Sequence, residues 1–285
     1  MFSIIKKLIL RITDRRPKIH CDVVTLKPND LLKGRCALIT GGTSGIGYSI
    51  AEAFLKSGAK VIITGRDKER LNKACNGLSL YGDVQGYVMD NTKIQSFDNV
   101  LASMLKECGS MIDILVNNAG VQGASYPNAH EDAYDATLDT NLKAPYFLSQ
   151  TIANIWVKQS IKGNILNVCS SSSLRPAISA YTISKWGLRG LTMGLAKSLI
   201  KHEIVVNGIA PGAVATPMLH KSNDGDLTYS HSPIGRYILP EEIANMAVFL
   251  VSNMGRSIVG DIVYMTGGMG VITYDDINYD VFKNE

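Results

Sequence analysis

Tyr181 and Lys185 are four positions apart, and together they could transfer a proton. On a helix this spacing places both side chains on one face, one turn from each other. A tyrosine that acts as an acid at neutral pH needs a pKa roughly 3 units below its usual ~10, or about 4 kcal/mol. One positive charge about 4 Å away supplies roughly that amount at an effective dielectric constant of about 20. The pair is therefore sufficient for proton transfer, although the same spacing is also typical of a solvated helix face.

A serine run precedes this pair, starting at Ser170. Residues 165–168 are apolar enough to form a short buried strand, so Ser170 would follow the carboxyl end of that strand. Open α/β sheets bind their ligands at this end of the strands. A hydroxyl there can donate a hydrogen bond to a substrate oxygen.

The first part of the chain predicts a phosphate-binding unit. A short strand begins at Cys36 and runs into the glycine-rich segment 40–47, a helix follows to residue 57, and a second strand covers residues 60–64. Glycines there let the backbone approach phosphates closely and present amide protons at a helix N-terminus. This order of elements is typical of a site for a dinucleotide pyrophosphate, although a glycine cluster alone also fits an ordinary turn.

The residues after the second strand bear on the choice of dinucleotide. An acidic side chain at this place binds the ribose 2′-hydroxyl of NAD, whereas an arginine can pair with the 2′-phosphate of NADP. The chain has Arg66 followed by Asp67. We therefore favour NADP and keep NAD as an alternative, and Arg66 could also be a surface cation.

Further strands are expected at residues 86–89, 112–116, 204–209 and 262–265, and helices at 133–158 and 241–252. Asn141 would lie in the middle of the first of these helices. A buried amide in that position needs hydrogen-bond partners. It could serve the active site or make a simple structural hydrogen bond.

Composition excludes several classes. The 285 residues carry a net charge of +4 without a basic block, which argues against a nucleic-acid partner. Five cysteines, an odd number without a C-x-x-C pair, favour a reducing compartment with neither a disulfide framework nor a metal site. We expect a cytoplasmic protein.

We place a domain boundary near Lys33, which gives an N-terminal extension (residues 1–33) and a catalytic domain (residues 34–285). Within the extension, residues 1–16 alternate apolar and basic side chains but are too short an apolar run to span a bilayer. This segment could dock on its own domain or on a partner subunit. Peripheral contact with an anionic membrane surface and disorder are the alternatives.

These motifs together resemble the classical short-chain dehydrogenase/reductase family over residues 34–272. The shared elements are Thr-Gly-x-x-x-Gly-x-Gly at 40–47, Asn-Asn-Ala-Gly at 117–120, Asn141, Ser170, Tyr-x-x-x-Lys at 181–185 and Pro-Gly at 211–212. The resemblance implies an α/β fold, a Rossmann-type doubly wound sheet of seven parallel strands. It also implies a homodimer or homotetramer assembled through the helices near Asn141 and Tyr181.

By the same resemblance the enzyme interconverts a ketone and a secondary alcohol by hydride transfer with NADP(H) or NAD(H). Tyr181 would be the general acid, Lys185 would bind the nicotinamide ribose, Ser170 would orient the carbonyl and Asn141 would support a proton path. The cofactor contacts would be Gly41, Thr43, Ser44, Gly45, Ile46, Gly47, Arg66, Asp90, Asn118, Ala119, Gly120, Tyr181, Lys185, Pro211, Gly212 and Thr216.

Some features depart from the family pattern. The segment from Ser170 to Tyr181 is about two residues short, so Ser171 or Ser172 could replace Ser170. A 3-oxoacyl thioester (acyl-carrier-protein) reductase and a sugar or polyol dehydrogenase are both alternatives, and a non-catalytic NADP-binding sensor or scaffold is a distant one. A carrier protein would need a basic patch, for which Lys143, Arg175 and Arg189 are candidates.

Overall fold

Seven parallel strands form one sheet in the order β3-β2-β1-β4-β5-β6-β7. The computed structural model describes residues 28–123, 125–219 and 225–270. Because β1 pairs with both β2 and β4, the winding of the chain reverses between β1 and β4, where sheets of this type bind ligands. This topology confirms the predicted Rossmann-type sheet. The strands are β1 (Cys36–Ile39), β2 (Lys60–Gly65), β3 (Val84–Val88), β4 (Ile114–Asn117), β5 (Asn164–Val168), β6 (Val205–Pro211) and β7 (Ile262–Met265).

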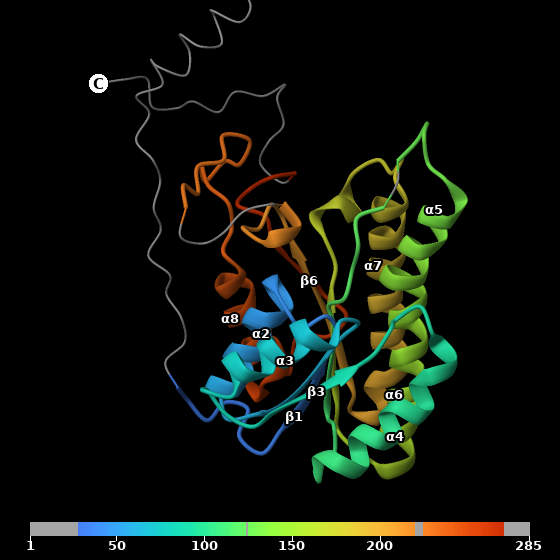
Figure 1. The fold of residues 1–285 in the computed structure, drawn as a ribbon, viewed down its shortest axis with the longest axis vertical. Coiled ribbons are helices and arrows are strands. Elements are labelled where there is room, and N and C mark those ends of the chain that lie inside the picture. Colours follow the sequence, from blue (N-terminus) through green and yellow to red (C-terminus); the bar gives the residue numbers. More distant parts are fainter. Residues whose placement is uncertain (1–27, 124, 220–224, 271–285) are drawn as a thin grey trace, which may run out of the picture.

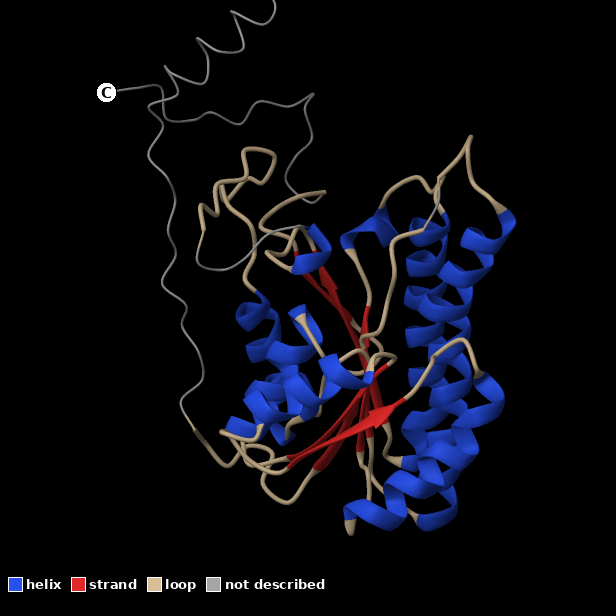
Figure 2. Ribbon diagram, in the orientation of Figure 1, coloured by secondary structure: helices blue, strands red, loops and turns tan. Residues whose placement is uncertain are grey.

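Helices cover both faces of the sheet (Figures 1 and 2). Figure 1 shows the sheet between two groups of helices, one on each face. The first group is α2 (Gly45–Lys56), α3 (Lys68–Leu78) and α8 (Pro240–Val251), and the second is α4 (Phe97–Cys108), α5 (Glu131–Leu138), α6 (Ala144–Gln159) and α7 (Ala180–Leu199).

Alternate residues of each central strand enter different cores. In β1, Ala37 and Ile39 belong to the core under α2 and α8, whereas Leu38 belongs to the core under α4 and α6. All three are fully buried. A strand buried on both faces needs apolar residues at every position, which is why it appears in the sequence as an uninterrupted apolar run.

The helix predicted over residues 133–158 is present over residues 131–159, but it is not one regular α-helix. A π-helical segment, Asp139–Lys143, separates α5 from α6. Pro145 lies in the first turn of α6 and has no backbone N–H, so it cannot donate the helical hydrogen bond to the carbonyl of Asn141. Single π-helical turns are frequent at functional sites, and this one carries Asn141.

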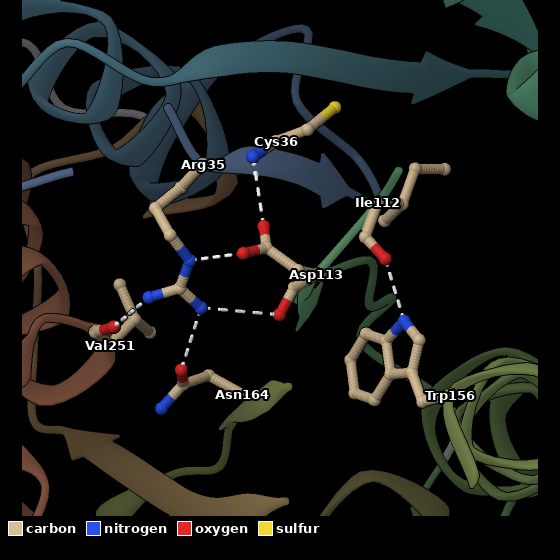
Figure 3. Close-up of polar contacts among 7 residues, drawn as sticks. All are labelled: Arg35, Cys36, Ile112, Asp113, Trp156, Asn164 and Val251. Carbon is tan, nitrogen blue, oxygen red and sulfur yellow. Dashed lines mark hydrogen bonds and ion pairs between the residues drawn. The ribbon is translucent and has the colours of Figure 1, made fainter. Parts of the chain in front are cut away.

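A network centred on Arg35 joins four elements at the amino ends of the strands (Figure 3). The guanidinium forms an ion pair with Asp113, donates to Asn164 Oδ1 (2.9 Å) and donates to the carbonyl oxygen of Val251 (3.2 Å). Asp113 also accepts a hydrogen bond from the backbone N–H of Cys36 (2.9 Å). These contacts tie the start of β1 to β4, β5 and the end of α8.

The amphipathic segment 1–16, for which the sequence leaves docking, membrane contact and disorder open, lies outside the described part of the chain. Leu32, which the predicted boundary assigns to the extension, is fully buried in the core under α2. Within the described ranges, no helix combines the length and apolarity needed to cross a bilayer.

Candidate active site

A cleft of about 850 Å³ opens at the carboxyl ends of the strands. It brings together most of the residues predicted from the sequence, although they come from segments more than 170 positions apart. Gly47 and Asn141 do not line it. The predicted residues that do are Gly41, Thr43, Ser44, Gly45, Ile46, Arg66, Asp90, Asn118, Ala119, Gly120, Ser170, Tyr181, Lys185, Pro211, Gly212 and Thr216.

The glycine loop between β1 and α2 has the backbone of a phosphate cradle. Gly41 and Gly45 have φ angles of +66° and +55°, which side chains disfavour. A Cβ at Gly41 would lie 2.9 Å from the Cα of Ala119. Ser44 makes no side-chain capping hydrogen bond to α2, and no acidic residue lies in the first turn. The positive end of α2 thus faces the cleft, and no acidic side chain of the first turn neutralises it. A dinucleotide pyrophosphate could bind to the free backbone N–H groups there.

Gly47 has a packing role instead of a contact with the cleft. A Cβ at this position would lie 2.3 Å from Nδ2 of Asn118 and 2.4 Å from the carbonyl oxygen of Gly41. That amide nitrogen donates to the carbonyl oxygens of Thr40 and Gly41 (2.9 and 3.0 Å). The absence of a side chain at Gly47 therefore leaves room for the Asn118 amide. This amide holds the glycine loop next to the end of β4.

The end of the cleft beyond β2 carries two arginines and one carboxylate. Arg66 and Arg70 line it together with Asp90. Burial raises the pKa of Asp90, but hydrogen bonds from Thr92 and the charge of Arg66 outweigh that effect and leave it lowered. Asp67 does not line the cleft. Its carboxylate caps α3 by accepting a hydrogen bond from the backbone N–H of Arg70 (2.9 Å).

Ser170 begins a short 3₁₀ turn after β5. Its hydroxyl oxygen accepts a hydrogen bond from the backbone N–H of Ser172 (3.1 Å), and its carbonyl oxygen accepts one from the hydroxyl of Ser173 (2.7 Å). Ser171 and Ser172 also line the cleft. The turn holds the Ser170 hydroxyl at the cleft wall, and both substitutes considered from the sequence remain beside it.

Tyr181 and Lys185 lie on the first turns of α7. Ser179 fixes the start of this helix, because its hydroxyl accepts a hydrogen bond from the backbone N–H of Thr182 (3.1 Å). Lys185 is 4% exposed, and its ammonium donates to the carbonyl oxygen of Val168 (2.8 Å). The ammonium nitrogen lies 5.7 Å from the centre of the Tyr181 ring. The two groups therefore face each other inside the cleft.

Asn141 does not line the cleft but holds its rim, which is the segment around Val121 after β4. Its Oδ1 accepts a hydrogen bond from the backbone N–H of Val121 (2.8 Å), and its Nδ2 donates to the carbonyl oxygen of the same residue (2.9 Å). Nδ2 also donates to the hydroxyl of Ser184 (3.1 Å), which donates to the carbonyl oxygen of Tyr181 (2.7 Å). Asn141 thus positions the segment after β4 relative to α7.

The positioning roles of two residues were not predicted from the sequence, although one of them, Thr40, begins the glycine motif at 40–47. Thr40 accepts hydrogen bonds from the backbone N–H groups of Asn118 (3.0 Å) and Ala119 (3.1 Å), and so joins the ends of β1 and β4. Ser184 connects Asn141 with α7. A hydroxyl directly after an apolar strand, and another three positions after a candidate acid, are the signals that could have identified them.

Comparisons with known proteins agree with this geometry. The family model described as short chain dehydrogenase matches residues 35–227. A gluconate 5-dehydrogenase from Gluconobacter oxydans is 33% identical over 84% of this chain and 96% of its own length. A 3-oxoacyl-[acyl-carrier-protein] reductase from Thermotoga maritima is 35% identical over 84% of this chain and 98% of its own.

A solved structure has the same fold. The L-sorbose reductase from Gluconobacter frateurii, complexed with NADPH and L-sorbose, has a TM-score of 0.77 and 31% identity, covering 85% of this chain and 99% of that chain. The parallel sheet, the glycine cradle and the family match lead to one conclusion. The chain belongs to the short chain dehydrogenase family, and it is an oxidoreductase that interconverts a carbonyl group and an alcohol.

Proposed function

We propose that the chain reduces a ketone, or oxidises the corresponding secondary alcohol, with Tyr181 as the proton donor and NADP(H) as the preferred cofactor. The observation that carries this proposal is the meeting of Tyr181, Lys185 and Ser170 in the cleft that also contains the glycine cradle. The cofactor, when bound, supplies or accepts the hydride. The protein supplies orientation, a proton and charge.

In the direction of reduction, the Tyr181 hydroxyl gives its proton to the carbonyl oxygen as that oxygen gains negative charge. The Ser170 hydroxyl donates a hydrogen bond to the same oxygen and stabilises the charge. The buried ammonium of Lys185, 5.7 Å from the ring centre, stabilises the phenolate that remains. By the family resemblance it also binds the nicotinamide ribose. Asn141 holds the rim and α7 in fixed positions relative to each other for this step.

The preference for NADP(H) is supported by the charges beyond β2. Arg66 and Arg70 line that end of the cleft, and two guanidinium groups suit a 2′-phosphate. Asp67, the acid that would favour NAD, is engaged as the cap of α3. The Gluconobacter frateurii reductase, with the same fold, was solved with NADPH.

Assembly into a homodimer or homotetramer is part of the proposal. Tyr146 and Val157 on α6, and Trp186 and Met193 on α7, are between 37% and 47% exposed. Apolar side chains on neighbouring long helices are the kind of surface that a second copy covers.

We also propose that the protein is located in the cytoplasm. The four described cysteines are free thiols, which is the state expected in a reducing compartment. Membrane contact through residues 1–16 can be tested by liposome co-sedimentation with and without residues 1–33.

The substrate classes that the sequence left open can be separated by one measurement. NADPH oxidation is followed in the presence of simple ketones, 3-oxoacyl thioesters and ketosugars. The relative named as a 3-oxoacyl-[acyl-carrier-protein] reductase supports the thioester class, and the relative named as a gluconate 5-dehydrogenase supports the sugar class. Turnover of at least one ketone that is lost in Tyr181→Phe supports the proposal. NADPH binding without turnover of any member would favour the sensor or scaffold alternative.

A further inference from the structure

The charged side chains of the cleft fall into separate groups. Arg66, Arg70 and Asp90 follow β2 and β3, on the side of the proposed 2′-phosphate, whereas Arg175 and Lys185 follow β5. β1 and β4 lie between these groups in the sheet. Among the described residues that line the cleft, no acidic side chain follows β4, β5 or β6. The described lining of the catalytic end is therefore cationic.

Arg175 has a fixed backbone between the catalytic serine turn and α7. Its backbone N–H donates to the carbonyl oxygen of Ser172 (3.2 Å), and its own carbonyl oxygen accepts a hydrogen bond from Nε1 of Trp186 (2.8 Å). Ser172 lies two positions after Ser170, and Trp186 directly follows Lys185. The base of the Arg175 side chain is thus tied to both segments that carry the proposed catalytic groups.

The guanidinium of Arg175 has neither an ion pair nor a hydrogen bond to any residue that the structure describes. The other basic candidates from the sequence differ in this respect. Lys143 forms an ion pair with Asp139 (2.9 Å) and Arg189 donates to the carbonyl oxygen of Ser173 (3.4 Å), and neither lines the cleft. The ammonium of Lys185 is engaged by Val168. Among the described residues that line the cleft, Arg175 is left as the available cation at the catalytic end.

We propose that the substrate is an anionic carbonyl compound and that Arg175 determines this specificity by pairing with its carboxylate. A planar guanidinium with five N–H donors matches a carboxylate in a bidentate arrangement. Met218, Leu219 and Met269 also line the cleft and would contact the carbon chain of the substrate. This inference rests on the proposed function, because it names the substrate class of the same site.

The test uses matched pairs of substrates that differ only in charge. Reduction by NADPH is measured for acetoacetate and methyl acetoacetate, for levulinate and methyl levulinate, and for a ketosugar acid and the neutral ketosugar of the same length. The full chain is expected to favour the acid in at least one pair. Arg175→Gln should lower the acid-to-neutral ratio of kcat/KM roughly 10- to 100-fold, mainly through KM, and Arg175→Lys should retain part of the ratio.

Arg256→Gln is the matched control, because it removes the same charge from an exposed arginine that pairs with Glu203 (3.3 Å) and does not line the cleft. Its acid-to-neutral ratio should equal that of the unchanged chain. An unaltered ratio in Arg175→Gln, or an equal fall in Arg256→Gln, overturns the inference. Preference for the neutral member of every pair overturns it as well.

A binding measurement separates this inference from the proposed function. Pentanoate has the carboxylate and the carbon chain but no carbonyl group to reduce. Calorimetric titration of pentanoate into the NADPH complex should show binding that Arg175→Gln weakens at least 10-fold and Arg256→Gln leaves unchanged. If no ketone is turned over, the proposed function fails, whereas Arg175-dependent pentanoate binding still supports the anion site. Turnover of neutral ketones without pentanoate binding overturns the anion site alone.

Discussion

The two ends of the same seven strands are held together by different means. At the carboxyl ends, the glycine loop, the serine turn and the rim after β4 are positioned largely by backbone groups and short polar side chains. At the amino ends, the long charged side chain of Arg35 joins β1, β4, β5 and α8 (Figure 3). Among the described residues, none of the charged side chains that line the cleft forms an ion pair, whereas Arg35 and Asp113 pair with each other at the amino ends.

The largest effect is expected at the carboxyl ends, where Tyr181→Phe removes one hydroxyl. Turnover should fall about 1,000-fold, because general acid catalysis contributes roughly 10²–10⁴-fold and phenylalanine has no proton to give. NADPH should still bind with nearly unchanged affinity, as titration of its fluorescence would measure. Tyr81→Phe, an exposed position outside the cleft, is the control. Activity within 10-fold of the unchanged chain would remove Tyr181 from the role of acid.

At the amino ends, Arg35→Met should affect stability more than chemistry. The substitution leaves the Asp113 carboxylate, 18% exposed, without its cationic partner, and loss of one member of a buried ion pair costs about 3–5 kcal/mol. The free energy of unfolding is measured in urea. The double variant Arg35→Met with Asp113→Asn should recover part of the loss. A single variant as stable as the unchanged chain would contradict the assigned role of this network.

Arg66→Ala should give a smaller and selective effect at the carboxyl ends. We expect KM for NADPH to rise about 10-fold while KM for NADH stays nearly constant, because only NADPH carries the 2′-phosphate. The control is Lys68→Ala, an exposed cation two positions along that does not line the cleft. An equal change in KM for both cofactors would contradict the role of Arg66 in 2′-phosphate binding and favour its interpretation as a surface cation.

The smallest effect concerns an ion pair at the start of α8. Arg236 donates to both oxygens of Glu242 (2.8 and 2.9 Å), which lowers the pKa of that carboxyl despite partial burial, and the backbone N–H of Leu239 adds to the effect. Glu242→Gln should cost at most about 1 kcal/mol at neutral pH, because the pair is partly exposed and screened by solvent.

The sign of its pH dependence follows from the lowered pKa. The stabilisation is fully present above the unfolded carboxyl value of about 4.3 and is lost as the pH falls through the folded value. Urea unfolding of both proteins at several pH values would show the difference between them shrinking below about pH 4. A difference that is constant with pH would mean that the variant acts through packing.

The fold and the candidate site residues could be predicted from the sequence where residues close together in the chain act together. The glycine loop, the Tyr181–Lys185 pair and the apolar strands depend on spacing within a few residues, and the fold was confirmed. Arg35 was not identified, because its partners Asp113 and Val251 lie 78 and 216 positions away. The hydrogen bonds that Asn141 makes were also missed, since its partner Val121 lies 20 positions away in the segment after β4. Long-range contacts of this kind leave no local pattern.

The single amide of Asn141 links two segments that line the cleft. It pairs with the backbone of Val121 at the cleft rim and, through Ser184, reaches the backbone of Tyr181. Under the proposed mechanism, the position of the segment after β4 and the direction of the Tyr181 hydroxyl therefore depend on the same side chain.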